Sequence, residues 1–387
     1  MARLLLIVPT LSSYEGFLSD FAETAMAAGH EVHVATQLKL LDGRSVEAHP
    51  TFKSGVQLHP ISMPRGSSPI TALKAAKELR GLVAKIQPDW IQAHFSAAAL
   101  VCALAKSSEW PFTSCVIQGL ACTLARGKAR LAAWCGERLA MARLDEMWVL
   151  TDDDFEVIKS WDSRKARLQR APGFGCRIDR FNGDNYSPEW RSERRTELGI
   201  QSEESVLIYV GRLAAFKGFD KVVHAYQNLQ HLGAPVRLLI LGAFDTLHSS
   251  GLSEEEVIDL KNDPSVIQPG WQGNVAEWLA VSDICVFPSE REGMPVCLME
   301  ALCMGVPVVT SNSRGCQNVV RDGVDGYVLK ETSVSQIVDV VDSLVNNPQT
   351  LSSMRISARE RRGEFDRTEY IQEQIDSLKE VLAIGGV

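Results

Sequence analysis

The sequence holds 387 residues, of which 45% are hydrophobic and 23% are charged. That length is sufficient for two domains of ordinary size, each with its own hydrophobic core. Lysine and arginine number 40 against 48 aspartate and glutamate, and the resulting formal net charge of −8 excludes a chain-wide basic surface for nucleic acid.

The nine cysteines form an odd set without a C-x-x-C pair, which indicates reduced thiols in a cytosolic compartment. Residues Leu4 to Val8 are apolar, but this run is too short for the hydrophobic region of a signal peptide. The longest apolar run, Ala97 to Ala105, is far below the roughly 20 residues that span a bilayer. We therefore expect a cytoplasmic protein that lies at most peripherally on the inner face of the cell membrane.

The first half of the chain alternates between strand and helix patterns. Strands are predicted at residues 4–8, 31–36, 56–60, 90–93, 112–117 and 147–150. A loop is predicted over Thr10 to Gly16, and helices are predicted at 17–28, 70–86, 97–106 and 130–144. Strands that alternate with helices of this length predict parallel βαβ units.

A turn-rich break at residues 171–186 is followed by a second alternation. Strands are predicted at 205–210, 236–241 and 266–268, and helices at 218–229, 254–261, 275–281, 334–345, 351–363 and 367–384. The fold class is therefore α/β, with two Rossmann-like doubly wound domains facing a central cleft. We place these domains at residues 1–175 and 176–365, and expect the helix at about 366–387 to pack back on the first. Ligands bind at the carboxyl ends of the strands in this architecture.

The stretch 288–307 combines two acidic residues with a predicted helix between two strand-like runs. Pro295 suits the first helical position, and Gly305 suits the end of the helix. Glu292 would lie just before the helix, and Glu300 about two turns away within it. The N–H groups at a helix start bind anions. Two carboxylates beside such a start predict a ligand with both hydroxyls and phosphates.

The loop from Gly211 to Gly218 follows the first predicted strand of the second domain. Arg212 and Lys217 flank this loop, and Gly218 opens the next helix. Two cations beside a helix start suit a diphosphate, because arginine binds phosphate bidentately and lysine supplies a mobile charge. A solvated basic turn is the alternative interpretation. The loop matches neither the Walker A pattern nor the dinucleotide-binding G-x-G-x-x-G pattern.

Together, the two stretches resemble the nucleotide-sugar site of GT4-type retaining glycosyltransferases, which have the GT-B fold of two Rossmann-like domains. The resemblance rests on Glu292-x7-Glu300 and on Gly211-Arg212-x4-Lys217-Gly218. It extends over nearly the whole chain, because the segments 29–32, 88–94 and 322–326 also resemble the family pattern. It implies a hexosyltransferase-type enzyme that takes its sugar, with retention, from a UDP-hexose or a UDP-N-acetylhexosamine.

The resemblance also implies a role for each matched residue. Arg212 and Lys217 would hold the donor diphosphate and stabilise charge on the leaving nucleotide. Glu300 would accept hydrogen bonds from the ribose hydroxyls, and Glu292 would contact the transferred sugar or the reacting face. His94, at the end of a first-domain strand, would lie near the sugar.

Further donor contacts are implied for the main chain. Backbone N–H groups would come from the segment that comprises Gly293, Met294, Pro295 and Val296. The first loop of the chain lacks the Gly-Gly pair common in the family, which leaves Gly16 as the candidate there.

No cofactor and no metal are expected, because the diphosphate already has protein cations. The run Thr151 to Asp154 could suggest an Asp-x-Asp metal site. The alternative, which we favour, is that Thr151 or Asp152 caps the following helix, whose first turn favours acidic residues.

The acceptor is indicated by weaker matches. The segments 61–69, 118–120, 291–295 and 314–316 resemble a bacterial subset that transfers sugars to polyprenyl-diphosphate-linked glycans for surface polysaccharide or glycoconjugate synthesis. Between Ala121 and Arg143, five basic residues and one acid are mixed with Leu131 and Trp134. A basic amphipathic helix can lie on an anionic membrane surface. The alternative is an ordinary packed helix whose charges face water.

Other functions fit the same fold. Nucleotide-sugar epimerases and synthases with soluble acceptors are enzymatic alternatives, and a sugar-nucleotide-binding protein without turnover is a non-enzymatic one. Release of UDP only when an acceptor is added favours a transferase, whereas epimerisation without acceptor favours an epimerase.

Overall fold

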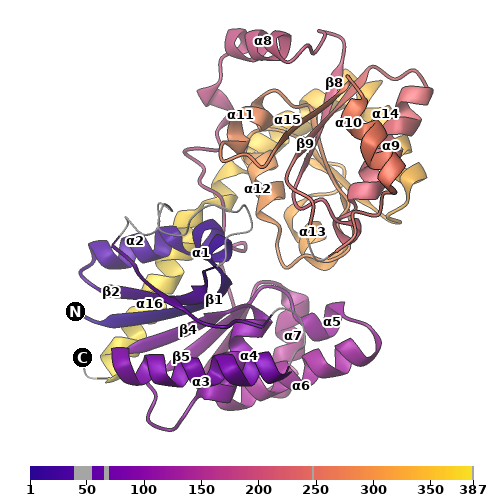
Figure 1. Ribbon diagram of the computed structural model, residues 1–387. Coiled ribbons are helices and arrows are strands. Elements are labelled where there is room, and N and C mark those ends of the chain that lie inside the picture. Colours follow the sequence, from indigo (N-terminus) through magenta and orange to yellow (C-terminus); the bar gives the residue numbers. More distant parts are fainter. Residues whose placement is uncertain (39–54, 65–68, 246–247, 386–387) are drawn as a thin grey trace. The chain divides into compact units, whose positions relative to one another are not determined.

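A computed structural model describes residues 1–38, 55–64, 69–245 and 248–385 of the chain (Figure 1). The chain divides into two compact units, of which the first comprises residues 1–174 and 368–387 and the second comprises residues 175–367. The domain boundaries predicted from the sequence, after residues 175 and 365, lie within two residues of the boundaries between these units, after residues 174 and 367.

The first unit is built on a seven-stranded sheet in the order β3-β2-β1-β4-β5-β6-β7. Every neighbouring pair in this sheet is parallel. The order reverses direction between β1 and β4, as expected for a doubly wound sheet. The strands are β1 (Arg3–Thr10), β2 (Glu31–Gln37), β3 (Gln57–Pro60), β4 (Trp90–His94), β5 (Thr113–Ile117), β6 (Glu146–Val149) and β7 (Ala166–Leu168).

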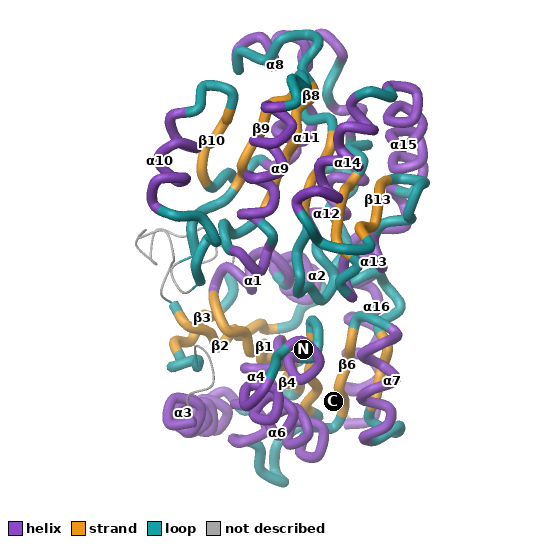
Figure 2. The backbone as a smooth tube through the Cα atoms, turned by 90° about the vertical axis from the view of Figure 1, so that its right-hand side faces the viewer, coloured by secondary structure: helices purple, strands orange, loops and turns teal. Residues whose placement is uncertain are grey.

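Helices cover both faces of this sheet, with α1 and α2 on one face and α3 and α4 on the other (Figures 1 and 2). Because both faces are covered, strands such as β4 and β5 are buried at every position. The helices are α1 (Leu11–Phe17), α2 (Ser19–Ala27), α3 (Pro69–Ile86), α4 (Phe95–Ala105), α5 (Ala121–Leu124), α6 (Gly127–Arg143), α7 (Asp152–Trp161) and the C-terminal α16 (Arg367–Gly385).

Polar contacts join α16 to the first unit. The carboxylate of Glu373 accepts hydrogen bonds from the backbone N–H groups of Arg170 and Ala171, at 3.0 and 3.2 Å. One residue further along, the side chain of Gln374 accepts a hydrogen bond of 2.9 Å from Gln92 of β4. Because Glu373 and Gln374 are both buried, these bonds satisfy polar groups that water does not reach.

The second unit is built on a six-stranded parallel sheet in the order β10-β9-β8-β11-β12-β13. Its strands are β8 (Ser205–Val210), β9 (Val236–Leu241), β10 (Val266–Gly270), β11 (Ile284–Phe287), β12 (Val308–Ser311) and β13 (Gly326–Leu329). Its α-helices are α8 (Pro188–Glu197), α9 (Phe219–His231), α10 (Glu254–Asn262), α11 (Val275–Ala280), α12 (Val296–Cys303), α13 (Arg314–Val319), α14 (Val334–Val345) and α15 (Pro348–Glu360). The order reverses between β8 and β11. The predicted α/β class with two doubly wound sheets is confirmed.

Two local predictions were wrong. The predicted loop from Thr10 to Gly16 is largely helix α1, because the Thr10 hydroxyl caps it by accepting a hydrogen bond from the Ser13 N–H at 3.2 Å. Pro295 has an extended conformation and precedes the first helical residue of α12, Val296. Strands β7 and β13 and helices α8 and α13 were not predicted. Within the acceptor segment 61–69, residues 65–68 lie outside the described residues.

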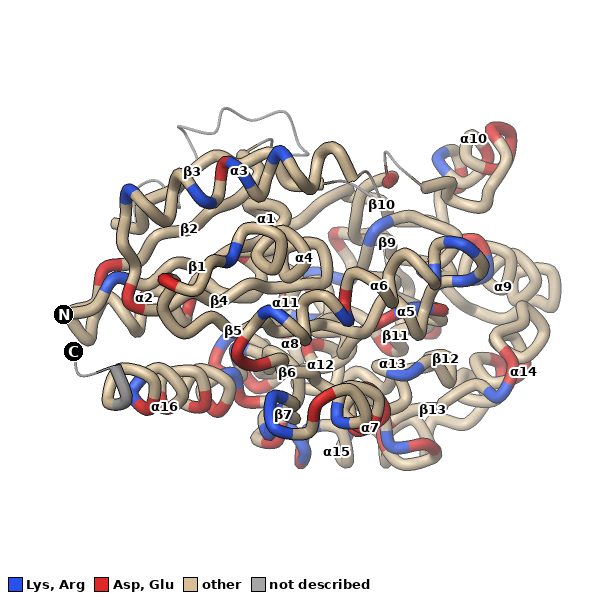
Figure 3. The backbone as a smooth tube through the Cα atoms, turned by 90° about the horizontal axis from the view of Figure 1, so that it is seen from below, with Lys and Arg blue, Asp and Glu red and all other residues tan. Residues whose placement is uncertain are grey.

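Basic and acidic residues are interspersed along several helices, such as α3, α8 and α16 (Figure 3). Within the described residues, no helix is both long enough and apolar enough to cross a membrane.

Candidate functional site

The loops after β8 and β11 meet at the reversal point of the second sheet. These two strands are direct neighbours, so their carboxyl ends deliver the loop Gly211–Gly218 and the loop Pro288–Pro295 to the same edge. The N–H of Glu290 donates a hydrogen bond of 2.9 Å to the carbonyl of Phe216. In addition, Lys221 forms an ion pair of 3.0 Å with the side chain of Glu290. The two sequence stretches that predicted a phosphate site are therefore joined directly.

Gly218 makes this close approach of the two loops sterically feasible. It has a left-handed conformation with φ = +74°, which side chains disfavour. A Cβ atom placed on it would lie 2.5 Å from the carbonyl oxygen of Pro288. On the other side of the same loop, a Cβ atom on Gly315 of α13 would overlap the carbonyl of Gly293. The loop after β11 is thus held between two glycine backbones.

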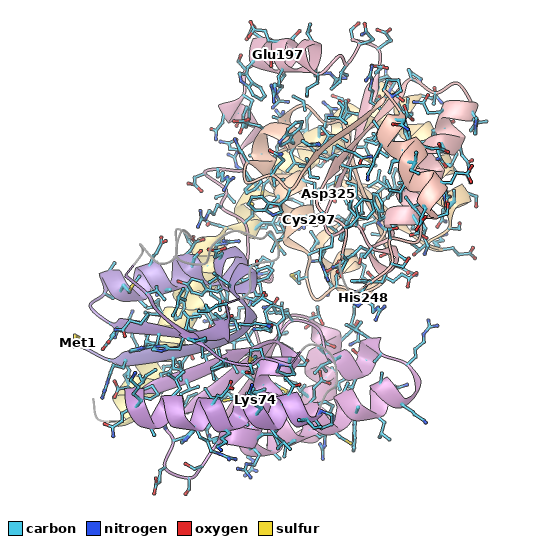
Figure 4. The ribbon with its side chains drawn as sticks, viewed as in Figure 1. Met1, Lys74, Glu197, His248, Cys297 and Asp325 are labelled. Carbon is cyan, nitrogen blue, oxygen red and sulfur yellow. The ribbon has the colours of Figure 1, made fainter. Side chains whose placement is uncertain are left out.

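Arg212 is partly exposed, and its guanidinium forms an ion pair of 2.5 Å with Asp245. Asp245 follows β9, the other neighbour of β8, and its carboxylate is almost fully buried. The same carboxylate accepts a hydrogen bond of 3.2 Å from the backbone N–H of His248, and the His248 ring (Figure 4) lies 3.2 Å from it. These contacts hold the Arg212 side chain in place and still leave it accessible to a ligand. Asp245 was not among the predicted site residues, although its place just after a buried strand was a signal.

Lys217 and Glu292 form a direct ion pair between the two loops. Their side chains are 14% and 12% exposed, so both charges are largely withdrawn from water. The resemblance assigned them to different parts of the donor, diphosphate and sugar, without indicating this contact. The pair shows that a ligand binding here would meet a lysine whose charge is already shared with a carboxylate.

Glu300 lies on the second turn of α12, where it is half-buried. In the described part of the chain its carboxylate makes no hydrogen bond or ion pair. Burial raises its pKa from 4.5 to about 7, and the charges of Arg367 and Arg180 oppose this rise only in part. A half-buried carboxyl group without a partner is able to exchange hydrogen bonds with the hydroxyls of a ligand.

The segment Gly293 to Val296 leads into the N-terminus of α12. Its Pro295 carries no N–H, so hydrogen bonds to a ligand from this segment are restricted to Gly293, Met294 and Val296. The first N–H groups of a helix have no intrahelical partner, and the positive end of the helix dipole adds to their attraction for anions. The predicted helix start is therefore present, and its binding of an anion through Gly293, Met294 and Val296 stays a prediction.

His94 ends strand β4 in the first unit and is fully buried. Its Nε2 lies 3.0 Å from the carbonyl oxygen of the Gln92 side chain, whose amide nitrogen donates to Gln374. This arrangement assigns the proton to Nε2 and leaves the buried Nδ1 without a partner among the described residues. Burial lowers the pKa of His94 to about 3, so its ring is neutral at physiological pH.

The residue after His94 is strained. Phe95 has φ = +71°, an unusual conformation for an aromatic residue, and such strain is often found at functional sites. The predicted contact of His94 with the transferred sugar stays a prediction. Gly16 is an exposed residue of α1 rather than part of a loop, and its predicted donor contact also stays a prediction.

The acidic run after β6 is part of a helix start. Thr151 caps α7, with its side chain accepting from the Asp154 N–H, and residues 152–154 occupy the first turn. Asp154 is buried and accepts a hydrogen bond of 3.2 Å from the N–H of Leu120. The described residues contain no cluster of three or more histidine, cysteine, aspartate or glutamate residues that could hold a metal ion. The capping interpretation of this run is confirmed.

Two family models match the chain and together extend over most of it. The model described as "Glycosyl transferase 4-like domain" matches residues 16–172, and the model described as "Glycosyl transferases group 1" matches residues 191–361. This chain belongs to the GT4-type glycosyltransferases. The predicted family and the predicted glycosyltransferase class of enzyme are thereby confirmed.

Similar proteins extend over nearly the full length. The capsular polysaccharide biosynthesis glycosyltransferase CapM of Staphylococcus aureus is 21% identical over 355 residues, which is 88% of this chain and 92% of CapM. Alr3699/HepE of Anabaena, in complex with UDP and glucose, has a TM-score of 0.80 at 15% identity and covers 98% of this chain and 100% of its own. Sucrose-phosphate synthase of Thermosynechococcus elongatus has a TM-score of 0.78 at 18% identity, with both chains covered fully. These likenesses confirm the predicted GT-B fold.

The close approach at Gly218 is testable by substitution. Gly218→Ala introduces both an unfavourable φ, which costs about 1 kcal/mol, and a Cβ clash with Pro288, which adds about 1–3 kcal/mol. Gly233→Ala at the other end of α9 is the matched control, because Gly233 has φ = +76° and no atom within 4 Å of the added Cβ. We expect Gly218→Ala to lower the free energy of unfolding clearly more than Gly233→Ala in urea denaturation. Equal losses would contradict the account of the loop contact.

The raised pKa of Glu300 predicts a pH dependence of stability. The native carboxyl, with a pKa of about 7, holds a proton that the unfolded chain, with a pKa near 4.5, releases. The stabilisation from this proton is therefore complete below about pH 4.5 and is lost as the pH rises to 7. We expect the wild type to lose stability relative to Glu300→Gln between pH 5 and pH 8, as measured by thermal unfolding. Parallel pH profiles of the two proteins would contradict the raised pKa.

Proposed function

We propose that this protein transfers a hexose or N-acetylhexosamine from a UDP-sugar to a glycan, with retention of anomeric configuration. The proposal rests on one observation, the junction of the loops after β8 and β11 at the reversal point of the second sheet. Cationic and acidic side chains of these two loops meet there. Arg212 and Lys217 supply positive charge there, Glu300 supplies a carboxyl group without a partner among the described residues, and α12 supplies a helix N-terminus. The nucleotide in the complexes of Alr3699/HepE supports UDP as the carrier.

Each group has a task in the proposed reaction. Negative charge builds on the diphosphate as its bond to the sugar breaks, and fixed cations aimed at that charge stabilise the transition state. Arg212, held by Asp245, is oriented before the ligand arrives, so little reorganisation is needed. Glu292 lies beside Lys217, where its carboxylate would face the positive charge that develops on the sugar ring. Glu300 would hold the ribose hydroxyls.

The acceptor that we propose is a polyprenyl-diphosphate-linked or other glycan of bacterial surface polysaccharide synthesis. The name of the CapM relative supports a place in capsule or related polysaccharide formation. We also propose that transfer needs no metal ion, since Arg212 and Lys217 already offer positive charge to the diphosphate.

A membrane-facing role is proposed for the segment Ala121–Arg143, which forms α5 and α6. Its side chains Arg126, Lys128 and Arg130 are exposed, as are Leu131 at 63% and Trp134 at 44%. The only acid of the segment, Glu137, is buried and accepts hydrogen bonds from the N–H groups of Ala121 and Cys122. The exposed surface of the segment is therefore entirely basic and apolar, which suits an anionic lipid surface.

The transferase proposal is tested by kinetics of UDP release from UDP-sugars, with and without glycan acceptor, in buffer that contains EDTA. We expect release only with acceptor, and expect Arg212→Ala to lower kcat by about 10²–10³-fold, the usual cost of removing one group that stabilises transition-state charge. Lys221→Ala is the matched control, because it removes a nearby cation of α9 that pairs with Glu290, a residue to which no donor contact is assigned. Epimerisation of the UDP-sugar without acceptor, or dependence on added Mn²⁺, would contradict the corresponding part of the proposal.

The membrane proposal is tested by flotation with vesicles of anionic or neutral lipid. We expect the wild type to float with anionic vesicles only, and the triple variant R126E/K128E/R130E to lose this binding. The triple variant K74E/K77E/K85E changes the net charge equally on the exposed side of α3 and should retain binding. Equal loss in both variants would indicate a general charge effect and contradict a site on α6.

A further inference from the structure

The aromatic ring of Phe216, in the loop after β8, is surrounded by cationic groups. The guanidinium carbons of Arg291 and Arg212 lie 5.0 and 5.2 Å from the ring centroid. The ammonium of Lys217 lies 5.5 Å from it. The ring of His248 packs edge-on against the same ring, with centroids 4.9 Å apart. The negative faces of an aromatic ring attract cations, so Phe216 can hold several cationic side chains together.

Only two of the three permanent cations have carboxylate partners in the described residues. Arg212 pairs with Asp245 and Lys217 pairs with Glu292. Arg291 is exposed, and its guanidinium makes no hydrogen bond or ion pair within the part of the chain that the structure describes. The cluster therefore carries one positive charge more than its own carboxylates neutralise. Like charges gathered in this way repel, and a bound anion would relieve the repulsion.

The backbone at Arg291 is fixed by the contacts that hold the two loops together. The Ser289 hydroxyl is fully buried and lies 3.4 Å from the carbonyl of Phe216, from the Arg291 carbonyl and from the Arg291 N–H. The next residue, Glu290, donates its N–H to the Phe216 carbonyl. The main chain on which Arg291 stands is thus anchored to the residue whose ring the guanidinium contacts. A guanidinium that lies against a ring keeps its N–H donors for a ligand at its edge.

We propose that Arg291 is a third phosphate-binding cation of the donor site, held ready by the ring of Phe216. Its ligand would be the diphosphate of a nucleoside diphosphate or of its sugar derivative, bound by paired N–H groups to two phosphate oxygens. This inference rests on the proposed function of the same site. The donor motif of the family consists here of Glu292 and Glu300, and Arg291 entered the sequence analysis only through the segment 291–295 and its acceptor resemblance, with no role toward the donor.

The proposal is tested by titration calorimetry of the full chain with UDP over a series of salt concentrations. We expect Arg291→Ala to weaken UDP binding by about tenfold, the size of effect expected for one charged hydrogen bond. We also expect the salt dependence of UDP binding to become shallower, because one charge contact with the phosphates is lost. Arg291→Lys should restore part of the affinity, since lysine keeps the charge but not the paired donors. Lys221→Ala should leave UDP binding unchanged.

The outcomes separate this inference from the proposed function. If the wild type binds UDP and Arg291→Ala binds it with the same affinity, the role of Arg291 is overturned while the proposed donor site stands. If Arg291→Ala weakens binding without changing its salt dependence, Arg291 acts through loop structure, which also overturns the role. If the wild type fails to bind UDP, GDP and ADP alike, the proposed donor site itself is wrong.

Discussion

The ion pair between Lys217 and Glu292 depends on one constraint, the adjacency of strands β8 and β11 at the reversal point of the second sheet. Seventy-five residues separate these two side chains in the sequence. They meet because parallel strands deliver their following loops to the same edge. The backbone contact between Glu290 and Phe216, and the absence of a Cβ on Gly218, then bring the loops close enough for the charges to pair. The rest of the site is arranged around this junction.

The charges of the site are compensated unevenly, and this unevenness suits an anionic ligand with hydroxyl groups. Arg212 and Lys217 each have a carboxylate partner, which keeps a cationic site stable before a ligand arrives. The pair of the partly exposed Arg212 with Asp245 contributes modestly to stability, so its main effect is to orient the cation. Glu300, by contrast, is without an ion-pair partner among the described residues and has a raised pKa. The site therefore contains both prearranged charge and a carboxyl group available for hydrogen bonding.

Much of the fold could be predicted from the sequence, because buried parallel strands are continuous apolar runs between helices. Strands β8 and β9 have the predicted bounds, whereas α1 was missed because Ser12, Ser13 and Gly16 favour loops as strongly as helix starts. The motif residues Arg212, Lys217, Glu292 and Glu300 were predicted as a group. Their partners were not, since the ion pair of Arg212 with Asp245 and the cluster at Phe216 depend on side-chain packing between separate loops.

The central claim is that the loops after β8 and β11 bind the diphosphate of a UDP-sugar. A crystal structure of the protein with UDP tests it most directly. The account predicts diphosphate oxygens within about 3.2 Å of the side-chain nitrogens of Arg212 and Lys217, and ribose hydroxyls within the same distance of the Glu300 carboxyl group. A UDP molecule bound at another edge of the sheet, with these residues still in their present ion pairs, would contradict it.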